Sequence, residues 1–492
     1  MTQAPAAAEL RGTTSFMSGH TNFIDGEWRA STGGTIPVID PSTALQFGEL
    51  SRGTAADVDD AVSAARHAFE RVWSKVSPVE RGRILGRFSR LITEHQEELG
   101  ALECRDVGKP LGQSRRDMIA CARYCEFYAG AADKLHGETL PYESGYTVLV
   151  LREPFGVTGH IIPWNYPAQI FGRSVIGSLA AGNAVVIKPG EEACQSILVL
   201  AHLAAEAGLP PGVLNVVTGL GAEAGAALAG HADVDHISFT GSPGTGTLVQ
   251  QAAARHNRPV TMELGGKSPQ VIFDDADIAL ALPVVYNAII QNSGQTCSAG
   301  SRLLVQEGVF ERVVAELATR FEGTRIGPAG EDLDCGPLIS AAQAERVRAF
   351  IDRAEQDGIP LAGRAAEAEA EAGFYVSPRL YGPVSREHTL AQHEVFGPVL
   401  AAMSFRDEDE ALDIANSTDF GLVAGVWTAD GGRQMRMARG IRSGQVFVNC
   451  YGAGGGIELP FGGYRRSGFG REKGMEGLRS FTQTKTIALY HG

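Results

Sequence analysis

Two rhythms of apolar and polar positions divide the first part of the chain. From Ala55 to Trp73, and again from Pro78 onward, apolar residues recur every three or four positions, which predicts two amphipathic helices. Residues 135–152 differ, because the turn sequence ESGY precedes the β-branched, extended run TVLVLR. This stretch predicts a protruding hairpin inserted between helical regions.

Short apolar runs then alternate with helical segments. The runs lie at 156–163, 183–189, 213–217, 236–239, 260–264 and 270–273. Strands separated by helices at this spacing predict βαβ units, and therefore a parallel sheet covered on both faces. A second alternating region extends from about residue 277 to residue 450 and includes the strand candidates RLLVQ and QVFVN. Gly265 and Gly266 follow a strand between the two regions and predict a domain boundary there.

Charge and composition narrow the class of protein. The chain has 492 residues, 44% of them hydrophobic, and a formal net charge of −14. An acidic chain of this kind argues against nucleic acid or an anionic membrane as its main partner. The N-terminal residues lack a basic segment followed by an apolar one, so no secretory signal is expected, and no apolar run reaches membrane-spanning length.

The cysteines point to a reducing environment. There are seven, an odd number, and no CxxC pair occurs. We therefore expect neither a disulfide framework nor a metal site, and a cytoplasmic location is the best match. Cys121 and Cys125 lie one helical turn apart and are expected to be buried packing residues.

Cys297 has an unusual setting for a buried cysteine. The surrounding sequence, NSGQTCSAG, consists of small and polar residues that leave the sulfur approachable and offer backbone N–H groups at a turn. Glu263 ends an apolar strand and precedes two glycines, which would aim its carboxylate into the ligand crevice of a parallel sheet. The alternative for Glu263 is an edge carboxylate that faces water.

Asn165 follows another strand and is bracketed by Pro163 and Pro167. A rigidly held amide is a good donor to an oxyanion. An Asx-turn that caps the helix beginning near Ala168 explains the residue equally well.

Two further segments suggest a dinucleotide. Lys188 and Glu191 follow the strand VVIKP and could hold ribose hydroxyls, or could be surface charges. FTGSPGTG (239–246) reads as a strand, a Gly-rich turn and a helix, which presents free N–H groups to a pyrophosphate. It is not the GxGxxG fingerprint, so alone it is a weak signal.

Together these segments resemble the NAD(P)-dependent aldehyde dehydrogenase superfamily, from about residue 20 to the C-terminus. The resemblance rests on PWNYP, KPGE, FTGS, MELGGKSP, GQTCSAGSR, EVFGPV (394–399) and LPFGGYRRSGFGRE (459–472), in the family's order and spacing. It implies a catalytic set and a cofactor-binding set. The catalytic set is Cys297 as nucleophile, Glu263 as general base, and Asn165 with the Cys297 N–H as oxyanion hole. The cofactor-binding set is Lys188, Glu191, Ser242, Glu394, Phe396, Trp164 and Gly241.

The resemblance also implies a fold and a reaction. The fold class is α/β: an atypical Rossmann cofactor domain (1–134 and 153–264), an α/β catalytic domain (265–450) and a β oligomerisation arm (135–152 and 480–492). The implied reaction is oxidation of a small-molecule aldehyde to the acid with NAD, NADP being possible, through a thiohemiacetal and a thioester that Glu263 helps to hydrolyse. A homodimer or homotetramer is implied.

Three alternatives stay open at this point. A coenzyme A-dependent semialdehyde dehydrogenase would use the same cysteine, although such relatives generally lack the base of the MELGG motif. A cysteine hydrolase would pair Cys297 with His160 or His236, and a non-catalytic protein could retain the fold. The substrate is not specified: the candidate tunnel residues mix polar and aromatic types, and no cluster of Arg or Lys stands beside Cys297. The tunnel candidates are Tyr166, Gln169, Thr296, Ser298 and Tyr451.

Overall fold

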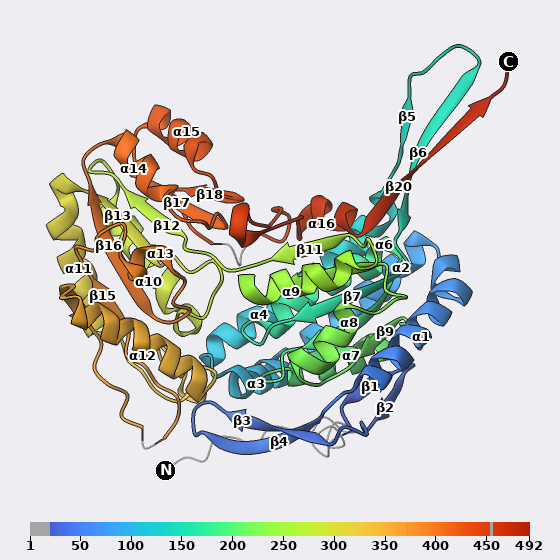
Figure 1. The fold of residues 1–492 in the computed structure, drawn as a ribbon, viewed down its shortest axis with the longest axis horizontal. Coiled ribbons are helices and arrows are strands. Elements are labelled where there is room, and N and C mark those ends of the chain that lie inside the picture. Colours follow the sequence, from blue (N-terminus) through green and yellow to red (C-terminus); the bar gives the residue numbers. More distant parts are fainter. Residues whose placement is uncertain (1–19, 371, 453–455) are drawn as a thin grey trace.

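The computed structural model describes residues 20–370, 372–452 and 456–492. These residues form an eight-stranded, a seven-stranded, a three-stranded and a two-stranded sheet, with helices packed on the two large sheets (Figure 1). Residues 1–19, on which the expectation of no secretory signal rests, lie outside the described part. Within it, no helix combines the length and the hydrophobicity needed to cross a membrane.

The eight-stranded sheet has a parallel centre. Its five central strands, in spatial order, are β11 (Val260–Glu263), β10 (His236–Thr240), β7 (Val157–Ile162), β8 (Ala184–Pro189) and β9 (Leu214–Val216). All five lie in the apolar runs predicted as strands. Antiparallel strands close both edges: β19 (Gly468–Phe469) pairs with β11, and β1 (Asn22–Ile24) pairs with β9 and with β2 (Glu27–Arg29). The sequence patterns did not predict these edges.

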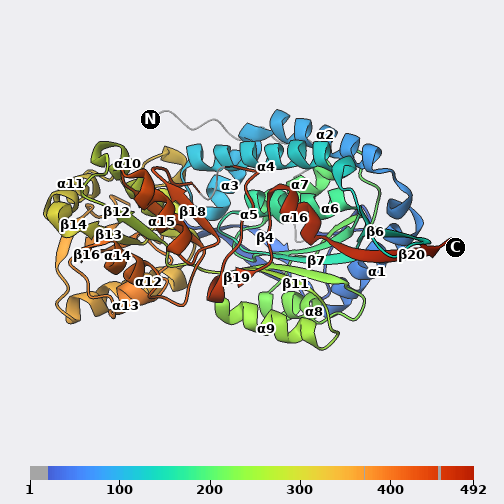
Figure 2. The same ribbon diagram turned by 90° about the horizontal axis from the view of Figure 1, so that it is seen from above.

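Helices cover both faces of this sheet, as expected (Figure 2). One face carries α2 (Pro78–Glu94), α3 (Gln96–Val107), α4 (Leu111–Ala131), α6 (Gly177–Ala181) and α7 (Gln195–Glu206). The other carries α1 (Ala55–Arg71), α8 (Ala226–Ala229) and α9 (Pro243–Ala254). The two amphipathic helices predicted from Ala55 and from Pro78 are α1 and α2.

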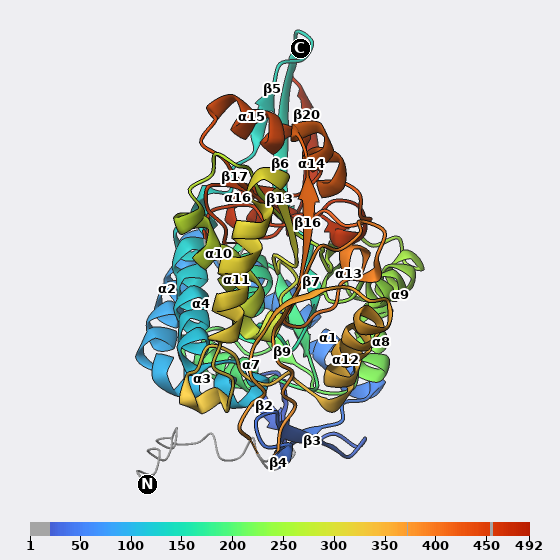
Figure 3. The same cartoon turned by 90° about the vertical axis from the view of Figure 1, so that its left-hand side faces the viewer.

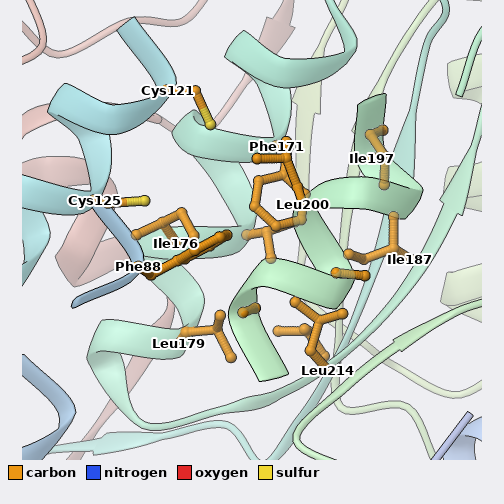
Figure 4. Close-up of a cluster of buried hydrophobic side chains, with 14 of the residues drawn as sticks. Phe88, Cys121, Cys125, Phe171, Ile176, Leu179, Ile187, Ile197, Leu200 and Leu214 are labelled. Atoms are coloured by element: carbon orange, nitrogen blue, oxygen red, sulfur yellow. The ribbon is translucent and has the colours of Figure 1, made fainter. Parts of the chain in front are cut away.

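A single apolar core fixes the first group of helices against the sheet. In Figure 4, side chains from α2, α4 and α7 meet side chains from β8 and β9 and from the segment after β7. Cys121 and Cys125 of α4 are fully buried in this core, which confirms their expected packing role. Phe171 belongs to a π-helical turn, η4 (Phe171–Ile176), which is preceded by the short helix α5 (Pro167–Ile170).

The seven-stranded sheet is also mainly parallel. Its spatial order is β14 (Leu361–Arg364), β15 (Arg379–Tyr381), β16 (Val399–Phe405), β13 (Arg302–Gln306), β12 (Pro269–Ile272), β17 (Val423–Trp427) and β18 (Gln445–Val448), with β14 antiparallel to β15. Helices α10 (Ile278–Ile290) and α11 (Phe310–Glu322) pack on one face. Helices α12 (Ala341–Gln356), α13 (Thr389–Gln392), α14 (Glu408–Ala415) and α15 (Gly431–Gly440) pack on the other. The chain passes from one large sheet to the other between Glu263 and Pro269.

A three-stranded sheet projects from the body of the molecule (Figures 1 and 3). It comprises β5 (Glu138–Leu140), β6 (Tyr146–Pro154) and β20 (Thr482–Tyr490), and β20 pairs with β6 along its whole length. This confirms the predicted hairpin. The ring of Tyr146 contacts the rings of Tyr142 and Tyr490. Helix α16 (Gly474–Ser480) leads into β20, and β3 (Thr35–Asp40) with β4 (Leu45–Ser51) forms the two-stranded sheet.

Two histidines are buried in the parallel sheet. His160 Nε2 lies 2.9 Å from Thr158 Oγ1, and His236 Nε2 lies 3.2 Å from Thr261 Oγ1. The ring of Phe481 packs against both. Burial lowers the pKa of each imidazole to about 3, so the folded protein holds both rings neutral.

This burial makes stability depend on pH. In the unfolded chain these histidines have a pKa of about 6.5, so below that pH the unfolded chain binds protons that the folded chain does not. The free energy of unfolding therefore decreases as pH falls from about 6.5 toward the folded-state pKa of about 3. Each histidine should contribute a slope of about 1.4 kcal/mol per pH unit in this window. We expect the thermal unfolding midpoint to fall less between about pH 7.5 and about pH 4.5 in the double variant His160→Gln/His236→Gln than in the unmodified protein. Parallel curves for the two proteins would contradict this.

Candidate active site

A cavity of about 1190 Å³ is lined by strand ends of the eight-stranded sheet and by helices α10 and α12, which pack on the seven-stranded sheet, together with the loops near them. Cys297, Glu263 and Asn165 are all in its lining. The residues come from three places in the fold: the loop after α10, the end of β11, and the loop after β7. The structure therefore brings these three side chains together in one cavity.

A strained loop presents Cys297. After α10 the chain turns through Asn292 and Ser293, both with left-handed φ (47° and 54°), and then through Gly294. A side chain at Gly294 would be excluded, because a Cβ there would lie 2.2 Å from the carbonyl oxygen of Gly397. The loop is thus held tightly against the segment before β16, and Cys297 is left half-buried in the cavity wall.

Asn165 is tied to the same loop. Its Nδ2 donates to the carbonyl oxygen of Gln295 (2.9 Å), and its own carbonyl oxygen accepts from Asn292 Nδ2 (3.0 Å). Helix α5 begins after Tyr166, and no side chain caps it. The Asx-turn alternative for Asn165 is therefore wrong, since the amide serves the cysteine loop and not the helix.

Glu263 is buried at the end of β11. Its side chain is 2% exposed, and neither carboxylate oxygen has a hydrogen-bond partner in the described residues. Burial raises the pKa of this carboxyl well above its usual value, and the nearby Glu472 adds to the rise. The alternative of a carboxylate facing water is wrong, and a buried, unpaired carboxylate is available to a ligand in the cavity.

The thiol of Cys297 is not acidic in this structure. Burial raises its pKa to about 11, while the guanidinium of Arg173 and the backbone N–H of Ser298 act in the opposite direction. A thiolate here needs a proton acceptor or a further positive charge.

Sequence reasoning missed the cations in the lining, of which Arg173 and Lys473 are the two that are buried. Arg173, in η4, forms an ion pair with Glu472, and Ser238 Oγ donates to the same carboxylate (2.8 Å). The signal for Arg173 was present, because it is the one charged residue in the apolar stretch 167–187. Lys473 directly follows the motif LPFGGYRRSGFGRE (459–472). The absence of an Arg or Lys cluster beside Cys297 in sequence thus did not carry over to the fold.

Three residues of the predicted cofactor-binding set, Trp164, Glu394 and Phe396, also meet in the cavity. Trp164 and Phe396 contact edge to face, with ring centroids 5.6 Å apart. Glu394 lies over the backbone after β11, accepting from the N–H of Gly266 (3.0 Å), and a Cβ at Gly265 would lie 2.1 Å from its carboxylate. Burial raises the pKa of Glu394 to about 7.

The turn between β10 and α9 lines the cavity from Gly241 to Gly244. Gly241 has no room for a side chain, since a Cβ would lie 2.5 Å from the ring of Phe239. Ser242 caps α9 and accepts from the N–H of Thr245 (3.2 Å). An N-terminal helix turn with a glycine-lined approach fits an anionic pyrophosphate.

Lys188 and Glu191 lie apart from the other candidates. They pair with each other (2.5 Å), and Glu191 Oε1 accepts from the N–H of Gly221 (3.1 Å). Lys188 is 2% exposed, so it is not a surface charge. The lining of the cavity includes neither residue, although Gly190 between them packs against Trp164.

All five tunnel candidates are confirmed as lining residues: Tyr166, Gln169, Thr296, Ser298 and Tyr451. Tyr166 Oη lies 2.8 Å from Thr296 Oγ1, and Lys109 Nζ lies 4.2 Å from the Tyr166 ring centroid. Lys109 is buried and paired with Glu103 (3.0 Å) and Asp117 (2.6 Å). A buried charge network therefore supports the wall beside Cys297.

The two histidines considered for a cysteine hydrolase are not near Cys297. His160 and His236 are buried in the sheet and belong to its core, and neither lines the cavity around Cys297.

A doubly wound sheet, a helix N-terminus for a pyrophosphate and a cysteine beside an unpaired carboxylate together define an oxidoreductase of the dinucleotide-dependent class. The cavity fits a nicotinamide dinucleotide in two respects. The backbone at Gly244 is open, since a Cβ there would meet nothing within 4 Å, and the two buried oxygens of Glu263 have no partner among the described residues.

Comparison with known proteins gives the family. The model of the aldehyde dehydrogenase family matches residues 28–487. The chain is 42% identical to aldehyde dehydrogenase family 2 member B4, mitochondrial, of Arabidopsis thaliana (98% of this chain, 90% of the relative) and 39% identical to human retinal dehydrogenase 2 (95% and 91%). A crystallised protein from Burkholderia cenocepacia is 62% identical with a TM-score of 0.95 (96% and 100%), and an NAD+ complex of aldehyde dehydrogenase from Bacillus cereus is 36% identical, also with a TM-score of 0.95 (99% and 100%).

The chain belongs to the aldehyde dehydrogenase family. It is an NAD(P)-dependent enzyme that oxidises an aldehyde to the carboxylic acid. Its atypical Rossmann fold explains the missing GxGxxG sequence.

Proposed function

We propose that the oxidation proceeds on Cys297, through a thiohemiacetal and a thioester, and that Glu263 acts as general base for hydrolysis of the thioester. The observation that supports this is the convergence of Cys297, Glu263 and Asn165 on one cavity together with Trp164, Gly241, Ser242, Glu394 and Phe396.

Cys297 attacks the carbonyl carbon as a thiolate. The charge that develops on the carbonyl oxygen needs donors that are already oriented. One hydrogen of the Asn165 amide is used by Gln295, which fixes the plane of the amide and leaves the second hydrogen for the oxyanion. The backbone N–H of Cys297 is the proposed second donor.

Bound NAD(P)+ would supply the acceptor for the hydride of the tetrahedral adduct. The residues proposed to hold it are Gly241 and Ser242 at the pyrophosphate, Glu394, Phe396 and Trp164 at the nicotinamide ribose, and Lys188 and Glu191 at the adenosine ribose. A carboxylate such as Glu191 binds a ribose 2′-hydroxyl and repels a 2′-phosphate, so we propose that NAD is preferred to NADP.

Glu263 removes a proton from water as the water attacks the thioester. A raised pKa makes its carboxylate a stronger base, and its two unpartnered oxygens leave both positions available to water. The same residue favours this route over transfer of the acyl group to coenzyme A, because relatives of the acylating type generally lack a base at this position.

We further propose a domain division and an assembly. Residues 1–134 and 153–264 form the cofactor domain, 265–450 the catalytic domain, and 135–152 with 480–492 an arm that builds a homodimer or homotetramer. The arm carries exposed apolar side chains, including Leu140, Tyr142, Leu489 and Tyr490. All seven cysteines are free, which supports a reducing compartment, and we propose the cytoplasm.

Replacing the base should separate the two chemical stages. Glu263→Gln is expected to give one equivalent of NADH and then to stall as a thioester, because it cannot deprotonate water. Cys297→Ala should give no NADH while it still binds NAD. Rapid-mixing absorbance at the NADH band and mass spectrometry of the quenched protein measure both. Unchanged steady turnover of Glu263→Gln, or acyl-coenzyme A as the product, would contradict the assignment.

Removing the amide should affect turnover far more than binding. Asn165→Ala is expected to lower kcat about 100- to 1000-fold, as the loss of one oxyanion donor does, with little change in the Kd for NAD. Steady-state kinetics and fluorescence titration with NAD provide the two values. A weakened Kd with kcat retained would assign Asn165 to cofactor binding.

The arm can be tested by placing charge on its apolar face. Leu489→Asp is expected to shift the protein toward a smaller assembly in sedimentation velocity, while Leu280→Asp, an equally exposed leucine at the start of α10, should leave the assembly unchanged. An arm that contributes nothing would give identical profiles.

A further inference from the structure

The cavity contains a lysine that the proposed mechanism does not use. Lys473 lines the same cavity as Cys297 and Glu263, and it is 2% exposed. Lysine is among the residues least often buried in proteins, so its position invites a chemical explanation.

The backbone of Lys473 is strained. Its φ and ψ are 64° and 161°, a combination that glycine adopts readily and other residues avoid. Hydrogen bonds hold the chain on both sides: the Phe461 N–H to Glu472 O (2.7 Å), the Glu472 N–H to Phe461 O (2.8 Å) and the Gly474 N–H to Ile457 O (2.9 Å). A glycine would relieve this strain, yet the position carries a long side chain directed to the cavity. Strain of this kind is found where a side chain is used.

Lys473 and Arg173 both contact the ring of Phe461. The Lys473 Nζ lies 5.5 Å from the ring centroid and the Arg173 Cζ lies 4.8 Å from it. Arg173 is engaged by Glu472 and does not release its proton in proteins. Of these two cations, only the amine of Lys473 can gain and lose a proton during turnover.

The charges around Lys473 allow that exchange near neutral pH. Burial and the Arg173 guanidinium lower the pKa of Lys473 to about 7, against the opposite effects of Cys297, Glu263 and Glu472. Glu263, whose own pKa is raised, holds a proton after it has deprotonated water and must pass it on before the next turnover.

We propose that the neutral amine of Lys473 accepts, through water in the cavity, the proton that Glu263 takes from the attacking water. This inference rests on the proposed function of Cys297 and Glu263. As the thioester is hydrolysed, the water oxygen bonds to the acyl carbon and one O–H bond breaks, its proton going to the Glu263 carboxylate. The C–S bond breaks and Cys297 leaves as thiolate. The proton then moves to Lys473, whose ammonium releases it to solvent.

Two substitutions distinguish proton exchange from simple charge. Lys473→Arg keeps the positive charge but cannot accept a proton, and Lys473→Gly removes the side chain while relieving the backbone strain. For both variants we expect one equivalent of NADH at the normal rate, followed by steady turnover at least 10-fold slower. Propanal and benzaldehyde serve as substrates in rapid-mixing experiments, and Lys75→Arg, at an exposed lysine outside the cavity, is the matched control.

The pH profile and chemical rescue complete the test. The neutral amine is the active form, so steady turnover of the unmodified protein should rise with pH through the Lys473 pKa. Lys473→Arg should lose this step and keep only the separate dependence on ionisation of Glu263. Added imidazole, a small base, should restore part of the turnover of Lys473→Gly. It should leave the turnover of the control Lys75→Arg unchanged. Thermal unfolding of Lys473→Gly should occur no earlier than that of the unmodified protein.

Several results would overturn the proposal. Full turnover of Lys473→Arg would mean that only charge matters, and loss of the first equivalent of NADH would mean that the lysine acts on Cys297. Glu263→Gln, assayed in parallel, keeps the two hypotheses separate. Normal turnover of Glu263→Gln contradicts the proposed function itself, whereas a stalled Glu263→Gln beside a fully active Lys473→Arg contradicts only the role of Lys473.

Discussion

The site depends on a reciprocal pair of hydrogen bonds between two loops 130 residues apart in sequence. Asn165 Nδ2 donates to Gln295 O, and Asn292 Nδ2 donates to Asn165 O. One loop follows β7 of the eight-stranded sheet and the other precedes β13 of the seven-stranded sheet. The bonds join the two loops in the wall of the cavity, and they orient the Asn165 amide beside the loop that carries Cys297.

Desolvation is the second shared constraint. Burial raises the pKa of Cys297, Glu263 and Glu394 and lowers the pKa of Lys473. Both directions favour the neutral form of the group. In such an interior the ionic forms needed for chemistry depend on one another, since each charge is stabilised mainly by its neighbours. Arg173 is the fixed charge of this set, held in place by Glu472. The thiol, the carboxylate and the amine are therefore best regarded as a single titrating system.

Sequence patterns predicted the central parallel strands and the residues at their carboxyl ends. Glu263 and Asn165 could be found because strand ends in a parallel sheet meet at one edge. Arg173 was not found, because it lies in a π-helical turn. Such a turn interrupts the regular spacing of helical residues, so the periodicity of the sequence does not show which side faces inward. Lys473 was not found either, since its arrival in the cavity depends on the long-range pairing of β19 with β11.

The β19–β11 pairing has a consequence for biosynthesis. Strand β11 carries Glu263 at its end, and its outer edge pairs with Gly468 and Phe469, which lie far along the chain from it. While the ribosome has yet to release these residues, the parallel sheet keeps an open edge with unpaired N–H and C=O groups, the kind of edge that invites pairing with other chains. Completion of the sheet edge beside Glu263 therefore waits for residues that are synthesised long after β11.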